Sequence, residues 1–129
     1  MITLADARRV IAAAEEKAEE IGQPSNIAVV DAGGNLKSFT RMDGAEIAGP
    51  SLAVDKAYTA VSNRITTEEL GTLAQPGGPL YGINANGNGR FVVFGGGIPI
   101  YSDGAIIGAV GVSGGAVEED IAIATASLP

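Results

Sequence analysis

The segment from Phe94 to Gly115, FGGGIPIYSDGAIIGAVGVSGG, constrains the fold more than any other part of the chain. Glycine recurs along it, and Ser102-Asp103-Gly104 is a strong turn signal. The apolar runs before and after that turn, Ile98–Tyr101 and Ala105–Val112, predict the two strands of a hairpin. Because strands joined by a tight turn must be antiparallel, the segment favours a mainly antiparallel sheet.

The same segment contains Gly111-Val112-Ser113-Gly114-Gly115, which matches the G-x-S-x-G pattern of serine hydrolases. That serine needs a base, usually His, and the chain has no His. We therefore interpret the motif as a tight strand-to-helix turn. The backbone N–H groups at the start of the last helix could hold a small anion, although three acidic residues in its first turn oppose that alternative. The nucleotide-binding patterns G-x-G-x-x-G and G-x-x-x-x-G-K-[ST] are both missing.

The 129-residue chain contains neither His nor Cys. Zinc and iron–sulfur sites of the usual kinds are thereby excluded. Carboxylate sites for magnesium or calcium stay open, but the chain has no D-x-D-x-D-G loop, and we expect no metal site and no cofactor. A net charge of −7 argues against nucleic acid as a partner. No apolar stretch is long enough for a membrane span, and the N-terminus does not have a signal-peptide pattern. The expectation is one cytoplasmic domain covering residues 1–129.

Periodicity predicts the other elements. Apolar residues at spacings of three and four predict a first helix from Leu4 to Ile21, capped by Thr3 and Asp6. Further helices are expected at Ile47–Arg64, from Thr66, and at Gly115–Leu128; further strands are expected at Ile27–Val30, Leu36–Arg41 and Phe91–Phe94. The order α-β-β-α-α-β-β-β-α predicts an α/β (α+β) fold, with a mainly antiparallel sheet of about five strands flanked by helices.

Three segments could contribute to a site. The Gly-, Pro- and Asn-rich stretch Gln75–Arg90 is a long loop, and such loops are often functional or mobile. Within Arg41-Met42-Asp43-Gly44, either Arg41 holds a ligand carboxylate or an Arg–Asp pair shapes a turn. Lys56 borders the small-residue face of its helix, so it either stretches its stem over apolar atoms or meets an anionic ligand.

Several blocks together carry a family resemblance: IAVVDAGGNLKSFTRMDGA, DKAYTA, LYGINA, FGGGIPIYSDGAIIGAVGVSGG and the acidic helix that follows. In this order, over nearly the whole chain, they resemble the GlcG/HbpS family, also known as the C-terminal domain of PduO-type proteins. The resemblance implies a compact α/β domain with a five-stranded antiparallel sheet that assembles as a homo-oligomer. Some family members bind haem, and one is an accessory to a redox-sensing kinase system.

The resemblance also implies a shared pocket between the second helix, the Gln75–Arg90 loop and the glycine-rich strands. Its candidate ligand-binding residues are Arg41, Met42, Lys56, Tyr81, Gly95, Gly96 and Gly97, and its candidate catalytic residues are Lys56, Asp43 and Asp31.

Four functions are compatible with these residues. The leading hypothesis is binding of a small anionic or carboxylate molecule, attracted by Arg41 and Lys56. The second is acid–base catalysis on that molecule, with Lys56 as a Schiff-base candidate. The third is haem binding, or a redox-sensing accessory role, through a non-His ligand: an oxygen of Thr, Ser or Tyr, or Met42. Haem is thus the alternative to the expectation of no cofactor. The fourth is a structural or oligomeric accessory.

Overall fold

The computed structural model describes all 129 residues, beginning with the predicted amphipathic helix α1 (Leu4–Ile21). The Thr3 hydroxyl accepts a hydrogen bond from the Asp6 N–H at 3.0 Å, and the Asp6 carboxylate accepts one from the Thr3 N–H at 3.3 Å. These reciprocal bonds satisfy N–H groups that the first helical turn leaves free. Gly22 ends α1 in the left-handed conformation, at φ 73°.

The sheet has four strands in the order β2-β1-β4-β3, and every neighbouring pair is antiparallel. The strands are β1 (Asn26–Asp31), β2 (Leu36–Arg41), β3 (Gly97–Ser102) and β4 (Ala105–Ser113). All six residues of the central strand β1 are buried, as its continuous apolar sequence predicts. The β3–β4 turn has positive φ at Asp103 and Gly104, which is the type I′ geometry expected of Asp-Gly.

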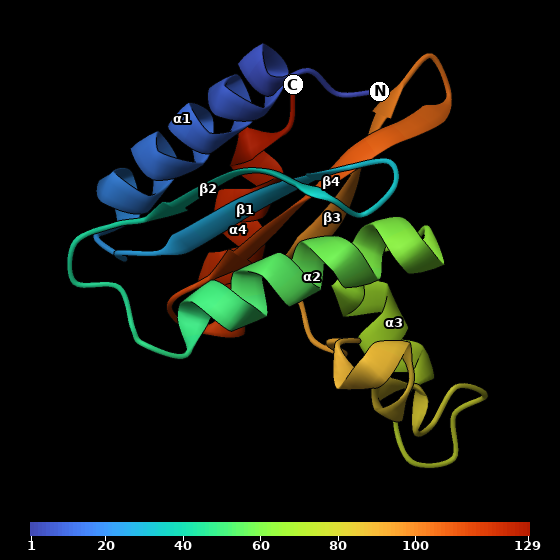
Figure 1. Cartoon of the computed structure of the whole chain (residues 1–129). Helices are drawn as coiled ribbons and strands as arrows, with labels where there is room; N and C mark the ends of the chain where they lie inside the picture. The colour runs from blue at the N-terminus through green and yellow to red at the C-terminus, as the bar shows by residue number, and fades with distance from the viewer.

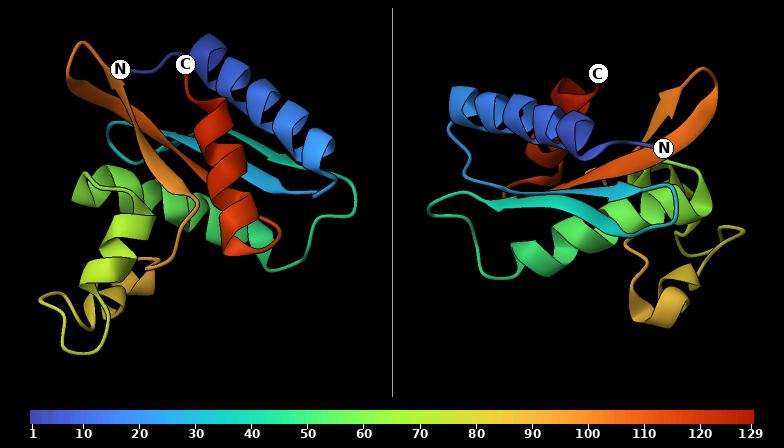
Figure 2. Two further views of the ribbon diagram at one scale, coloured as in Figure 1. Left: turned by 180° about the vertical axis from the view of Figure 1, so that it is seen from behind. Right: turned by 45° about the horizontal axis from the view of Figure 1, so that its top comes forward.

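Helices cover both faces of the sheet. α1 and α4 (Val117–Ser127) lie side by side on one face, and α2 (Gly49–Asn63) crosses the other (Figures 1 and 2). The larger core lies under α1 and α4, where Ile27 and Val29 meet Ile123. Under α2, Val30 packs on Ala57 and Ala60. Because successive side chains of β1 point to opposite faces, this one strand supplies both layers.

Helix α2 lies unusually close to the sheet because both surfaces lack bulk. A Cβ added at Gly111 would collide with the backbone of α2 at Ala53 and Ala57, and one added at Gly97 would collide with the Lys56 carbonyl. The small residues of α2 and the glycines of β3 and β4 thus allow the helix backbone to lie directly against the strands. This close packing places the Lys56 side chain next to β3 and β4.

The prediction of a fifth strand at Phe91–Phe94 is wrong. The Val92 N–H donates to the Thr59 hydroxyl of α2 at 3.0 Å, so it is not bonded to a neighbouring strand. Strand β3 begins only at Gly97. The Gly97 N–H donates to the Thr67 hydroxyl of α3 at 2.9 Å, so a helix side chain also holds the start of this strand. An apolar run alone cannot distinguish a strand that pairs in a sheet from a segment that packs on a helix. Here the hydroxyl of Thr59 accepts the backbone hydrogen bond that a neighbouring strand would otherwise accept.

The remaining elements lie beyond the C-terminal end of α2. Helix α3 (Thr67–Leu73) is followed by the predicted long loop, which contains only two short 3₁₀ turns, Ile83–Ala85 and Gly87–Gly89. This part of the chain projects away from α1 and α4 (Figure 2). None of the helices has the length and apolar character needed to span a bilayer.

Candidate functional site

Lys56 is the largest fully buried side chain. Its ammonium donates to the Val112 carbonyl at 2.8 Å and to Asp120 Oδ2 at 3.0 Å. Asp120 lies in α4 and is itself buried, and its other oxygen accepts a hydrogen bond from the Gly115 N–H at 3.1 Å. The pair therefore connects α2 on one face of the sheet to the β4–α4 turn on the other.

The glycine-rich segment forms the wall around this ammonium. Gly96 has φ +126°, and a Cβ there would lie 2.8 Å from Lys56 Nζ. A Cβ at Gly95 would collide with Ile121 of α4. The Phe94 ring centroid lies 5.1 Å from Nζ, within cation–π range, and Phe94 is 42% exposed. Two oxygens and one aromatic face thus surround the ammonium, and of the side chains in this set only Phe94 is exposed.

Burial changes the protonation of both partners in opposite directions. It lowers the pKa of Lys56, an effect that the Asp120 charge opposes. It raises the pKa of Asp120, which Lys56 in turn opposes. A less basic amine beside a more basic carboxyl is a combination suited to proton transfer.

The structure gives Asp31 a local structural role. Its Oδ1 accepts hydrogen bonds from the N–H groups of Gly33 at 2.9 Å and Asn35 at 3.0 Å, and from the Asn35 side chain at 3.3 Å. The bond from the Asn35 backbone is the main reason that the pKa of Asp31 is lowered. Asp31 therefore shapes the β1–β2 turn, and no hydrogen bond or ion pair connects it to Lys56.

The other predicted polar residues lie apart from Lys56. Arg41 and Asp43 are exposed, and Tyr81 is 68% exposed on the long loop. Strand β1 separates β2, which carries Arg41, from β4, whose carbonyl holds Lys56. Met42 is half-buried and packs against the larger core. Of the predicted set, only Gly96 and Gly97 lie against Lys56, while Gly95 faces Ile121 of α4. The roles assigned to all these residues stay predictions.

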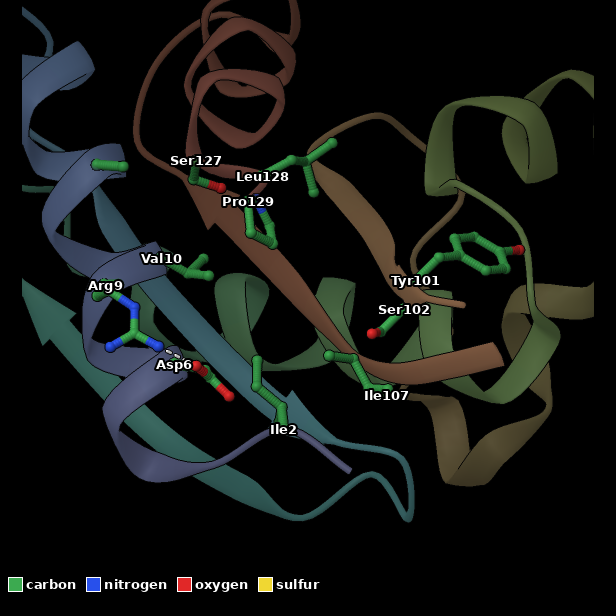
Figure 3. A pocket seen from close by; sticks show the side chains of 11 residues that line it. Ile2, Asp6, Arg9, Val10, Tyr101, Ser102, Ile107, Ser127, Leu128 and Pro129 are labelled. Atoms are coloured by element: carbon green, nitrogen blue, oxygen red, sulfur yellow. Dashed lines mark hydrogen bonds and ion pairs between the residues drawn. The ribbon is translucent and has the colours of Figure 1, made fainter. Parts of the chain in front are cut away.

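A separate cavity of about 440 Å³ opens where the two ends of the chain meet (Figure 3). We call it the terminal cavity. It is lined by Ile2, Asp6, Arg9, Val10, Ala13, Tyr101, Ser102, Ile107, Ser127, Leu128 and Pro129. These residues come from the start of the chain and α1, from the β3–β4 hairpin and from the end of α4. The volume falls within the range of roughly 300–1,000 Å³ that is typical of ligand sites.

The terminal cavity combines apolar walls with a charged edge. Ile2 and Val10 are buried in the core, while Ile107 and Leu128 complete the apolar lining. Arg9 reaches the edge from α1, where one guanidinium nitrogen pairs with Asp6. Such a site can hold a ligand with an apolar body and an acidic group.

Residues of the terminal cavity and the partner of Lys56 were both missed by sequence reasoning. In the sequence, Asp120 is one of three acidic residues favourable to a helix N-terminus, and Arg9 belongs to no motif. No spacing rule connects residues 64 positions apart, so only the fold brings Asp120 to Lys56.

Comparisons with known proteins agree on one family. The family model described as "Haem degrading protein HbpS-like" matches residues 2–129. An uncharacterized 15.0 kDa protein in the dhaT–dhaS intergenic region of Citrobacter freundii is 46% identical over 127 residues, which cover 98% of this chain and 89% of that protein.

Two solved structures are also similar. The Klebsiella pneumoniae protein ORFY has 42% identity and a TM-score of 0.96, and the match covers 98% of this chain and 88% of that one. The PduOC:haem complex has 38% identity and a TM-score of 0.95, with 98% of this chain and 92% of that one covered.

Proposed function

This chain belongs to the HbpS-like family of haem-degrading proteins, and from that premise we propose that it binds a haem-class small molecule, one with an apolar body and carboxylate groups. Support comes from the PduOC:haem complex, which shares 38% identity with this chain over nearly its whole length. Haem carries two propionate groups, so the proposal also keeps the prediction of a carboxylate ligand.

The terminal cavity is the observation that carries this proposal. Its apolar walls suit a hydrophobic ring, and Arg9 at its edge suits a carboxylate. The predicted anion site at Arg41 and Lys56 has weaker support, because the Lys56 ammonium already has Asp120, a carbonyl and an aromatic ring around it.

The lining residues fit the organic part of haem better than its iron. The chain offers no imidazole and no thiolate, which are common axial ligands. Tyr101 supplies the one phenol of the cavity, and its ring is directed away from Arg9 (Figure 3). We therefore assign the ring and its carboxylates to the cavity.

Titration of the purified protein with haem tests the proposal directly. We expect a saturable change in the Soret band, and competition by an excess of a small aromatic carboxylate. A Soret spectrum identical to that of haem with an unrelated acidic protein would contradict haem-class binding.

The Lys56–Asp120 pair supports a second candidate function, which is chemistry on a small carbonyl compound. The neutral amine would attack the carbonyl carbon, forming a C–N bond and a carbinolamine. Asp120 would carry the two amine protons to the oxygen, the C–O bond would break, and the oxygen would leave as water. The product is an imine, and Phe94 must move to admit the substrate.

Borohydride trapping with short aldehydes tests this second function. We expect a reduced adduct on Lys56, formed faster in Phe94→Ala, with Lys17 and Lys37 as internal controls for unselective modification. Labelling confined to Lys17 and Lys37 in both proteins would rule the reaction out.

A further inference from the structure

We propose that this chain recognises the apolar ring and the carboxylates of its ligand, independently of any metal, so that a metal-free dicarboxylic porphyrin binds the terminal cavity as tightly as haem. The inference rests on the proposed function and specifies how that same site selects its ligand. Three features of the cavity support it: the scarcity of side chains that could coordinate a metal, the unused N–H donors of Arg9, and the apolar walls.

Two polar side chains of the cavity, Asp6 and Ser127, already have partners within the chain. Asp6 pairs with Arg9 and also accepts the Thr3 N–H. The Ser127 hydroxyl donates to the Ala124 carbonyl at 2.7 Å. Both side chains are therefore held in place by contacts within the chain.

The remaining candidate iron ligands in the lining are the exposed side chains of Tyr101 and Ser102, and a neutral Ser hydroxyl is not among the usual axial ligands of haem iron. Tyr101 is 55% exposed, and its phenol is directed away from the charged edge of the cavity (Figure 3). The two methionines, Met1 and Met42, are not part of the lining. Iron coordination therefore adds little to binding here.

Arg9 can take a carboxylate in addition to Asp6. A guanidinium has five N–H donors, and in Arg9 only the pairing with Asp6 uses one. The side chain is 72% exposed, so the remaining donors are accessible. Hydrogen bonds with the side chain and then the backbone of Thr3 lower the pKa of Asp6, so Asp6 stays anionic and offsets part of the attraction. The contribution of Arg9 is therefore modest.

Arg8 and Arg9 provide a matched pair of variants. Both are exposed on α1, but only Arg9 lines the cavity. Arg9→Ala should weaken binding of haem and of protoporphyrin IX equally, by about threefold to fivefold at low salt, as expected for an exposed charge pair. Arg8→Ala removes the same charge and should leave both affinities unchanged.

Ala13 and Ala12 provide a second pair, which tests the location. Ala13 lines the cavity, whereas Ala12 is exposed and does not. Ala13→Leu should reduce binding of both porphyrins by about tenfold or more, because its side chain occupies ligand volume. Ala12→Leu adds the same side chain outside the cavity and should have no effect. Circular dichroism of each variant checks that the fold is intact.

The decisive measurement compares dissociation constants for haem and metal-free protoporphyrin IX, by Soret absorbance and porphyrin fluorescence. Values within about threefold of each other, with the variant effects above, support the inference. Haem binding ten times tighter or more would show that iron is recognised and would overturn it, leaving the proposed function intact. Equal affinities that Ala13→Leu leaves unchanged would overturn the assignment of the site. If neither porphyrin binds, the proposed function itself fails.

Discussion

At the scale of single residues, Lys56 shows how burial changes the meaning of a charged side chain. An ammonium without water needs partners at each donor, and the Val112 carbonyl, Asp120 and Phe94 provide them. The pair is a structural connection between two faces of the sheet whether or not it also reacts. Each buried charge is compensated by the other, so a substitution of one residue should change the effect of substituting the other.

Asp120→Leu should lower the free energy of unfolding by about 3–5 kcal/mol, because it leaves the buried ammonium unpaired. The double variant Lys56→Met, Asp120→Leu should recover most of that loss, because no buried charge remains. Urea denaturation of the wild type, both single variants and the double variant measures the coupling. Additive losses in the double variant would contradict mutual dependence.

Gly96 makes room for the Lys56 ammonium. Gly96→Ala should destabilise the fold by more than Gly104→Ala, although both glycines have positive φ. At Gly104 an added Cβ meets nothing within 4 Å, so its cost is the conformational strain of about 1–2 kcal/mol. At Gly96 collisions with the Val112 carbonyl oxygen, 2.5 Å from the added Cβ, and with the Lys56 side chain add to the strain. Thermal denaturation ranks the two, and equal losses would exclude the steric effect.

Asp31 makes stability depend on pH. Because its pKa is lower in the folded state, Asp31 contributes stability above its unfolded value of about 3.9, and this contribution is lost as the pH falls through the folded pKa. The melting temperature of Asp31→Asn should therefore fall furthest below that of the wild type near pH 6. The difference should shrink below about pH 4. A difference that is constant from pH 3 to 6 would contradict this origin.

At the scale of elements, helix α2 organises the chain on both sides of it. It packs on the glycines of β4 through its small face, and its Thr59 holds the Phe91–Phe94 segment that leads into β3. Thr59 also donates to the Asp55 carbonyl at 2.6 Å, so one hydroxyl serves both the helix and the segment.

Thr59→Val should release that segment at almost constant side-chain volume. The buried Val92 N–H then has no partner, at a cost of about 1–3 kcal/mol. Hydrogen exchange at Val92 should accelerate, while exchange at β1 amides changes only with global stability. Thr72→Val, at an exposed position of α3, is the matched control. Unchanged protection of Val92 would show that another contact holds the segment.

At the scale of the whole molecule, assembly into a homo-oligomer stays a prediction. Several large apolar side chains are exposed, among them Ile47 at 97% and Leu36 at 52%. Sedimentation velocity over a range of concentrations should give a mass that is a multiple of 12.9 kDa. A single species at 12.9 kDa throughout would contradict the prediction.

Local patterns were sufficient for most of the elements. The caps of α1, the Asp103-Gly104 turn and the continuous burial of β1 depend on residues close in sequence, whose preferences act within one turn or one strand. The family, too, could be recognised from short blocks in their order along the chain, and the HbpS-like match confirms it. The composition by itself, with neither imidazole nor thiol, limits the metal chemistry open to the chain.

Only the tertiary structure decided the composition of the sites. Phe91–Phe94 has the composition of a strand, yet its Val92 N–H donates to the hydroxyl of Thr59 in α2 and not to a neighbouring strand. Asp120 lies 64 residues after Lys56, and the terminal cavity draws its walls from both ends of the chain and the hairpin. Such neighbours are selected by packing the layers together, because burial energy depends on which surfaces meet in space and not on their separation along the sequence.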